Sequence, residues 1–372
     1  FASPSHVSIQ ISHRDTGFPV EYYKDTLTGT TLCDYLTRQF EKQVSQYSFR
    51  AKGSGKSGLL TASHCGQEIL SRTACEITEK GITARFFVGF PANGRTINAT
   101  ELEKILFDFL PVCIQKSFFY SSLNAKELQN YIELAEDQEF IRQTLPAKNL
   151  CAFIADGSIL PRESGISSRP MKASIPFTSP DSLRISINLP HKGKITGMGI
   201  PKGITLIVGG GYHGKSTLLN ALELGVYNHI PGDGREYVIT DATAVKLRSE
   251  DGRFIKDVDI SMFINDLPNK KDTRCFSTLD ASGSTSQAAG IVESMEAGSH
   301  LFLLDEDTSA TNFMVRDAFM QQVIQREKEP ITPFLERAED LYKKAGISTI
   351  LVAGSSGAFF HIADTIIQMD NY

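Results

Sequence analysis

Hydrophobic and polar positions alternate differently in the two parts of the chain. In the first part, apolar residues recur at helical spacing in three stretches, 31–47, 101–109 and 125–145. Strands are predicted for three shorter runs, 7–12, 72–77 and 83–88. This mixture predicts an α+β domain. A passage rich in Pro, Gly and Ser at 156–180 precedes a further strand at 183–189, and we place the domain boundary between residues 165 and 166.

In the second part, residues 166–372, buried apolar runs are followed by helical patterns. The clearest runs are Ile204–Val208, Leu301–Leu304 and Thr349–Val352. Such runs are typical of a parallel sheet whose strands are joined by crossover helices, which predicts an α/β fold. Small or polar residues follow each run, so the carboxyl ends of these strands are expected to form a ligand-binding edge.

Composition narrows the class of protein. The 372 residues carry a net charge of −5 and 41% hydrophobic residues, as expected for a soluble globular protein with two or three cores. No run of about 18 apolar residues is present, so we expect no membrane partner. The six cysteines lack zinc-ligand spacing and favour a reducing compartment. Because the chain opens with Phe1 rather than Met, we expect that any targeting segment was removed earlier.

A phosphate-binding motif directly follows the strand predicted at 204–208. The pattern G-x-x-x-x-G-K-[ST] is matched by Gly209, Gly210, Gly211, Tyr212, His213, Gly214, Lys215 and Ser216, and Thr217 continues into a predicted helix. The glycines let backbone N–H groups face phosphate oxygens, Lys215 places a cation beside the β and γ phosphates, and the Ser216 hydroxyl can ligate Mg²⁺. We therefore predict a nucleotide site with ATP and Mg²⁺ as cofactors.

Two carboxylates follow the strand predicted at 301–304. Asp305 is placed to hold Mg²⁺ through its water shell, and Glu306 is placed near the attacking water as a base or orienting group. Phosphoryl transfer needs both a metal-holding carboxylate and a group that orients or deprotonates water. Together with Lys215, these residues form the predicted catalytic set.

The segment 38–56 is basic and ends in a flexible run rich in Gly and Ser. Arg50, Lys52 and Lys56 are its candidate RNA contacts, although a solvated loop explains the same pattern. The run Lys52–Ser57 looks like a second phosphate loop, but the motif would need Gly at position 50, which is Arg50. We reject it as a nucleotide site.

The stretch Asp305–Asn312 resembles the D-E-P-T-S-A-L-D sequence of ABC-class ATPases, and the spacing of a second motif agrees. The signature serine of those proteins lies a little over twenty residues before the Asp, and here Ser282 lies 23 residues before Asp305. Ser282, Gly283 and Ser284 are therefore similar to a signature loop. Two features depart from the family pattern: Val352 leads into Ala353 and Gly354 instead of a switch His, and no Gln lies near 260–264.

Along nearly its whole length, the chain resembles the family described as ATPases of the ABC class. The resemblance rests on five stretches, 156–165, 197–201, 229–236, 281–289 and 305–317. It is similar in particular to the trypanosomatid mitochondrial members associated with RNA editing. The resemblance implies an ABC-type fold with an accessory domain, an ATP-dependent homodimer, RNA binding through the accessory part, a link to an RNA-editing complex and a place in the mitochondrial matrix.

A homodimer is also plausible on physical grounds. The signature and phosphate loops of one ABC chain lie far apart, so Ser282–Ser284 can reach a γ-phosphate only when another protomer presents it. The same residues also suit a polar helix N-terminus, and both roles are compatible. The spacing from Lys215 to Ser282, 67 residues, predicts a reduced helical subdomain, which makes a transporter role unlikely.

Two functions remain open from the sequence. One is an ATPase whose nucleotide-driven homodimer binds RNA. The other is a nucleotide-gated RNA-binding scaffold that does not hydrolyse ATP, which the absent switch His and Gln would explain. A DNA-repair clamp would be expected to carry long heptad arms, and none occurs here.

Overall fold

The computed structural model describes residues 3–267, 270–316, 329–354 and 357–370. By contacts, the chain divides into two compact units. The N-terminal unit comprises 1–140, 189–193 and 227–236, and the C-terminal unit comprises 141–188, 194–226 and 237–372. The first division by contacts falls after residue 140. The boundary between residues 165 and 166 concerns domains that fold independently, and it stays a prediction.

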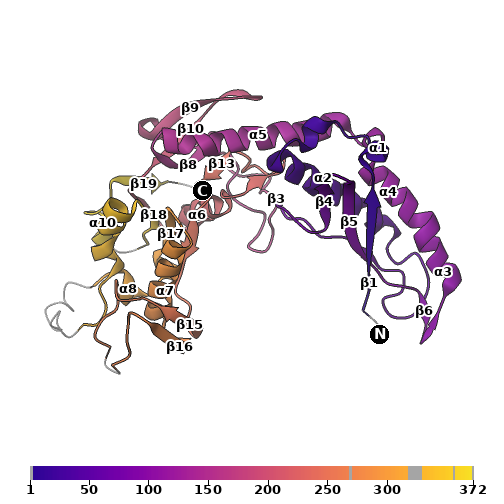
Figure 1. Ribbon diagram of the computed structural model, residues 1–372. Coiled ribbons are helices and arrows are strands. Elements are labelled where there is room, and N and C mark those ends of the chain that lie inside the picture. The colour runs from indigo at the N-terminus through magenta and orange to yellow at the C-terminus, as the bar shows by residue number, and fades with distance from the viewer. Residues whose placement is uncertain (1–2, 268–269, 317–328, 355–356, 371–372) are drawn as a thin grey trace. The chain divides into compact units, whose positions relative to one another are not determined.

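The N-terminal unit is built on an antiparallel sheet with one buried face (Figure 1). Strand β5 (Gly81–Val88) lies between β1 (Ser5–Ile11) and a second edge formed by β2 (Leu60–Thr61) and β4 (Cys75–Thr78). Alternate residues of β5 are buried, because side chains along a strand point to opposite faces. These residues share a core with apolar side chains of α2 (Thr26–Tyr47) and α4 (Leu110–Phe118).

Helix α2 begins five residues before its predicted start. Asp25 and Thr28 form a capping box, in which the Asp25 carboxylate accepts a hydrogen bond from the Thr28 amide at 2.8 Å. The cap satisfies amide groups that a helix leaves without internal partners, so the helix begins there rather than at the first apolar position.

The predicted helix at 101–109 is part of a longer helical stretch. It comprises α3 (Ala99–Glu103) and a π-helical turn (Lys104–Phe109) that leads into α4. The predicted helix at 125–145 is confirmed as α5 (Ala125–Ala147). The other described elements of this unit are short: α1 (His13–Thr16), β3 (Glu68–Ile69), β6 (Ala92–Asn93), β7 (Thr96–Ile97) and β12 (Asn228–His229).

The C-terminal unit contains the predicted parallel sheet, which is confirmed. Its strand order is β14-β17-β18-β11-β19. The strands span Val245–Leu247 (β14), Leu301–Asp305 (β17), Ser348–Val352 (β18), Ile204–Gly209 (β11) and Thr365–Met369 (β19). All are paired in parallel.

Both faces of this sheet are buried, as the apolar runs predicted. In β17, Leu301 and Leu303 pack in one cluster with α6 (Lys215–Leu224). Phe302 and Leu304 pack on the other face, in a cluster with residues of α7 (Gly283–Glu296) and α10 (Phe334–Ala345). The strands are therefore fixed between two hydrophobic layers.

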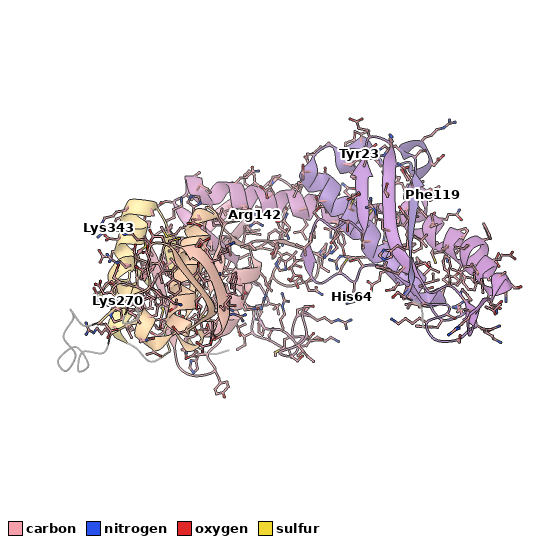
Figure 2. All side chains as sticks on the ribbon, turned by 60° about the horizontal axis from the view of Figure 1, so that its bottom comes forward. Tyr23, His64, Phe119, Arg142, Lys270 and Lys343 are labelled. Atoms are coloured by element: carbon pink, nitrogen blue, oxygen red, sulfur yellow. The ribbon has the colours of Figure 1, made fainter. Side chains whose placement is uncertain are left out.

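A second, antiparallel sheet in the same unit was not predicted. Its order is β13-β8-β10-β9, with strands Val238–Thr240, Leu150–Ala155, Gly193–Pro201 and Arg184–Leu189. It shares the hydrophobic cluster of α6. Arg142, labelled in Figure 2, lies near the end of α5 and donates hydrogen bonds to the carbonyl oxygens of Gly225 at 3.0 Å and Thr240 at 2.7 Å.

Between α6 and α7, the described residues form short strands and no helix. The main feature is the hairpin of β15 (Arg253–Val258) and β16 (Phe276–Ala281). This agrees with the predicted reduction of the helical subdomain. The remaining α-helix described is α8 (Thr311–Met314). Throughout the described part of the chain, no helix combines the length and the apolar character needed to cross a bilayer.

Candidate nucleotide site at the sheet edge

The predicted site residues of the C-terminal unit follow three neighbouring parallel strands. In the register, Ile207 of β11 and Asp305 of β17 both pair with Val352 of β18, from opposite sides. The chain after each strand therefore leaves at the same edge of the sheet. Strands two places apart are about 10 Å apart, so the phosphate loop and the two carboxylates lie on either side of β18.

The phosphate loop needs glycine at two positions for different reasons. Gly214, which precedes α6, has a left-handed backbone with φ of 85°. At Gly209, φ is 149° and an added Cβ would lie 2.5 Å from the Met369 carbonyl oxygen of neighbouring β19. Tyr212 adopts φ of 62° without being glycine, and its side chain is 99% exposed. The glycines thus permit a tight loop that directs backbone amides towards a ligand.

Lys215 lies at the first position of α6 and turns back over the loop. Its Nζ donates hydrogen bonds to the carbonyl oxygens of Gly209 at 2.7 Å and Gly210 at 2.9 Å. The ammonium charge therefore lies beside the loop, next to a helix N-terminus that itself favours anions. His213 is more peripheral, with Nδ1 3.8 Å from the exposed carboxylate of Asp370.

The residues predicted to hold Mg²⁺ have suitable chemistry. Ser216 is exposed at the start of α6, so its hydroxyl is accessible. Asp305 is 7% exposed at the end of β17, and its Oδ1 accepts a hydrogen bond from the Asp307 amide at 3.2 Å. Hydroxyl and carboxylate oxygens are the donors Mg²⁺ prefers, usually with several waters retained. The two side chains fit a hydrated Mg²⁺ between loop and strand.

Glu306 is held by the strand that lacks the switch His. Its Oε2 accepts a hydrogen bond at 2.7 Å from the backbone N–H of Gly354, two residues beyond the end of β18. A Cβ at Gly354 would lie 3.3 Å from an Asp307 carboxylate oxygen, so this turn passes close to the acidic residues. A backbone N–H thus holds Glu306 at the end of the strand after which the sequence lacks a switch His.

The three signature residues are not equally accessible. Ser282 is the exposed N-cap of α7, and its Oγ lies 3.0 Å from the Thr285 hydroxyl. Gly283 is half-buried. Ser284 is 7% exposed and donates a hydrogen bond at 2.7 Å to Oδ1 of Asn312. Ser282 is therefore the most exposed of the three.

Gln287 is a structural link that sequence reasoning missed. Its buried amide donates to the Ser309 hydroxyl at 3.0 Å and accepts from the Ala310 amide at 2.9 Å. The signature helix is thereby tied to the segment that directly follows Asp305 and Glu306. The buried face of α7 also carries Ser284, Ser286 and Ser294, so a polar residue there did not stand out in the sequence.

A cavity of about 470 Å³ lies beside the phosphate loop. Gly214 and Thr217 line one side, and most of the remaining wall is apolar. The wall includes Phe177, Leu183, Met198 and Met369. Phe177 is half-buried and packs against the hydrophobic cluster of α6. Its position arises from long-range packing, which local periodicity does not report.

The Phe177 wall is held by the stretch Asp156–Ser158. The Gly157 amide donates to the Phe177 carbonyl oxygen, and the Phe177 amide donates to the Ser158 carbonyl oxygen, both at 2.8 Å. The Asp156 carboxylate accepts from the Ser179 amide at 2.6 Å and from the Thr196 hydroxyl at 2.8 Å. One of the five stretches singled out in the sequence thus shapes the cavity.

Comparison with known proteins agrees with this geometry. The P-loop domain of the ABC-class ATPase family matches residues 124–372, and the family's N-terminal domain matches residues 1–121. The chain belongs to the ATPases of the ABC class. The predicted fold class, an ABC-type P-loop domain with an N-terminal α+β accessory domain, is confirmed. A P-loop domain of this class is typical of proteins that bind nucleotides.

One curated relative is an uncharacterized protein of Methanocaldococcus jannaschii. It is 32% identical to this ABC-class ATPase over 248 residues, which make up 63% of this chain and 54% of the relative. The match thus spans about half of the relative's length. Residue 317, at the end of the last stretch that carries the resemblance, lies outside the described residues.

The predicted RNA contacts of this ABC-class ATPase lie in the N-terminal unit, on the loop after α2. Arg50, Lys52 and Lys56 are all exposed. The Arg50 guanidinium lies 4.7 Å from the centre of the Tyr47 ring, and the Lys52 amide donates to the Glu101 carboxylate at 2.8 Å. The loop is therefore anchored while its cations face solvent.

Acid should destabilise the wall anchored by Asp156. Partial burial raises the pKa of Asp156, but hydrogen bonds from Ser179 and Thr196 and the Arg184 charge outweigh it, so the pKa lies below 3.8. The ionised Asp156 carboxylate therefore stabilises the fold fully above about pH 3.8. This stabilisation is lost as the pH falls through the lower pKa that Asp156 has in the folded state. Asp156→Asn should lower the melting temperature by a few degrees at pH 7, and the difference should shrink below about pH 4.

The matched control for this change is Asp181→Asn. The Asp181 side chain is 92% exposed and also pairs with Arg184. Its loss should leave the melting temperature nearly unchanged at either pH, because exposed ion pairs contribute little. Equal melting temperatures for Asp156→Asn and wild type at pH 7 would contradict the anchoring role.

Proposed function

We propose that the chain binds ATP·Mg²⁺ at the sheet edge and hydrolyses it. The observation that carries this proposal is the shared edge of β11, β18 and β17, which brings Lys215, Asp305 and Glu306 into one region. Residues Gly209–Thr217 surround the phosphates, with Lys215 beside the β and γ phosphates. Ser216 and the water shell of Asp305 hold Mg²⁺, and Glu306 orients or deprotonates the attacking water.

The adenine ring fits the cavity beside the loop. A base attached to phosphates at Gly214 and Thr217 would extend into the apolar space that these two residues line together with Phe177. An aromatic side chain at such a wall provides a stacking surface for a flat ring. The apolar lining thus supports a nucleotide in preference to inorganic phosphate alone.

Two copies of the chain complete each other's sites. Ser282 is exposed at the N-terminus of α7, and a helix N-terminus stabilises negative charge. Ser282 and this N-terminus would bind the γ-phosphate presented by a second protomer, so ATP would close a homodimer and hydrolysis would release it. Gln287 and Asn312 would couple this contact to the segment that follows Glu306.

The ATP-driven dimer binds RNA through the N-terminal unit, with Arg50, Lys52 and Lys56 as contacts. Their exposure and positive charge support a phosphate-binding role. By resemblance, the RNA function belongs to RNA editing in the mitochondrial matrix, where the chain would associate with an editing complex.

The alternative is a nucleotide-gated RNA-binding scaffold without turnover. It is favoured by one observation, the bond between Glu306 and the Gly354 amide beyond a strand that lacks a switch His. A backbone amide can position Glu306 but cannot exchange a proton with the reacting groups at neutral pH. In this alternative ATP would close the dimer and remain bound.

Glu306→Gln distinguishes the two functions. If Glu306 acts as base, turnover should fall about 100-fold or more, because an amide cannot accept the proton. ATP binding should persist, and light scattering should show accumulation of the ATP-bound dimer. Glu296→Gln, an exposed change at the end of α7, is the control and should turn over as wild type does. Wild-type turnover by Glu306→Gln would remove Glu306 from its role, and an inactive wild type that binds ATP would establish the scaffold.

Neutralising Arg50, Lys52 and Lys56 together to Gln tests the RNA contacts. Each lost contact between a cationic side chain and a phosphate should reduce the slope of log affinity against log salt concentration by roughly 0.7 to 0.9. The triple variant should therefore bind a labelled oligonucleotide more weakly and with a flatter salt dependence. A control triple of exposed lysines in the same unit, Lys80, Lys116 and Lys126 to Gln, carries the same charge change. Equal loss in both triples would indicate only a general charge effect.

A further inference from the structure

The outward face of the sheet in the N-terminal unit carries a hollow that the nucleotide site does not use. Along β5, Thr83, Arg85 and Phe87 alternate with buried residues and face away from α2 and α4. Across the ladder, Ser8 pairs with Arg85 and His6 pairs with Phe87. Polar and aromatic groups are thus presented together on neighbouring strands.

An aromatic pair forms one side of the hollow. The rings of His6 and Phe87 meet edge to face, with centroids 4.5 Å apart. The contact with His6 restrains the orientation of the Phe87 ring, although Phe87 remains 40% exposed. A rigid, partly exposed ring of this kind is a platform on which another flat ring can stack.

The hollow has a volume of about 590 Å³ and lacks acidic lining. Its wall includes His6, Ser8, Ser63, Arg72, Arg85 and Phe87, and no Asp or Glu among the described residues. Ser63 lies on the loop that also carries His64, between β2 and β3 (Figure 2). The carboxylates that pair with these arginines lie outside the lining, so cations and hydroxyls face the hollow, which favours an anionic ligand.

The two arginines of the wall differ in how firmly they are held. Arg72 donates to the fully buried carboxylate of Asp34, so its charge is needed in the fold. Arg85 pairs with Glu76 at 2.7 Å, and both side chains are more than 40% exposed; the guanidinium also donates to the Thr73 carbonyl oxygen at 2.6 Å, which holds it at the rim of the hollow. Such an exposed pair contributes little and can be exchanged for a phosphate. Arg85 is therefore the cation available to a ligand.

The basic loop is hydrogen-bonded to the chain just beyond the end of β5 that carries Phe87. Two residues after Phe87, the Gly89 carbonyl oxygen accepts from the Gly58 amide at 2.8 Å, and the Gly89 amide donates to the Leu59 carbonyl oxygen at 2.7 Å. The loop that carries Arg50, Lys52 and Lys56 thus meets the same end of β5. A ligand that reaches from the hollow to this loop would be a polynucleotide strand with several phosphates, not a single nucleotide.

We propose that this hollow binds an unpaired nucleotide of an RNA strand, with the base stacked on Phe87 and a neighbouring phosphate on Arg85. The strand would continue to Arg50, Lys52 and Lys56, so this inference rests on the proposed RNA binding. Stacking needs an exposed base face, which a duplex does not offer, so the ligand is single-stranded. Because every base has such a face, binding would tolerate many sequences.

A single tryptophan reports this stacking directly. The chain contains no Trp, so Phe87→Trp places one indole in the hollow and retains a stacking surface. Adding a twelve-nucleotide oligouridylate should quench its fluorescence, with a midpoint equal to the dissociation constant measured by anisotropy. The control is Phe107→Trp, at a position 72% exposed and outside the lining of the hollow. Its fluorescence should be unaffected.

Truncation gives an independent measure. Phe87→Ala should weaken oligouridylate binding about tenfold, the usual effect of removing one stacking ring. Arg85→Gln should reduce the salt slope by roughly 0.7, which is typical of one phosphate contact on a single strand. Phe107→Ala should bind as wild type does. Circular dichroism would show that each variant is folded, as expected for outward-facing positions.

The results separate failure of this site from failure of the proposed function. Suppose that wild type binds oligouridylate, that Phe87→Ala binds it equally well, and that the fluorescence of Phe87→Trp is not quenched. The hollow is then not the binding site, but the proposed RNA binding is retained. If wild type binds neither oligouridylate nor a mixed-sequence strand, both the stacking site and the proposed RNA binding are wrong. Quenching in Phe87→Trp with tenfold loss in Phe87→Ala establishes the site.

Discussion

Parallel pairing of β11, β18 and β17 is the constraint on which the candidate site depends. Both faces of these strands are buried, so their register is fixed by two hydrophobic layers as well as by their hydrogen bonds. Parallel direction brings three separate segments of sequence to one edge. The phosphate loop, the Gly354 turn and the acidic pair each follow a strand and need no further folding to meet. Any change that shifted β18 would displace Glu306 from Gly354 and from the phosphate loop together.

The Gly354 turn distinguishes this site from the wider family pattern. A His side chain can rotate and titrate, whereas a backbone N–H is fixed by the turn that carries it. Glu306 is therefore oriented by the end of β18 itself. The other side of the acidic segment is joined to α7 through Gln287 and Asn312. Hydrogen bonds within one unit thus connect α7 to the segment that directly follows Glu306.

Sequence reasoning succeeded where the signal was local. The runs at 204–208, 301–304 and 349–352 predicted the central strands, and the glycines of 209–214 predicted the loop between β11 and α6. Their periodicity and spacing are properties of short segments, and burial on both faces leaves continuous apolar runs.

What the sequence could not predict depends on contacts between distant segments. The antiparallel sheet pairs β8 with β10 and β13, which are far apart in the chain. Phe177 reaches the cavity because Gly157 and Ser158 pair with it. Pairing of His6 with Phe87 likewise joins neighbouring strands whose residues are 81 positions apart in the chain. No periodicity within either segment indicates its partner.

The central claim is that the shared sheet edge binds a nucleotide through Lys215, and calorimetric titration with Mg·ATP tests it most directly. Wild type should bind one ATP per chain. Lys215→Ala should bind ATP at least about tenfold more weakly, because hydrogen bonds to charged groups contribute about 1.5 to 3 kcal/mol. Equal affinity and heat for the two proteins would show that ATP binds elsewhere, and would contradict the account.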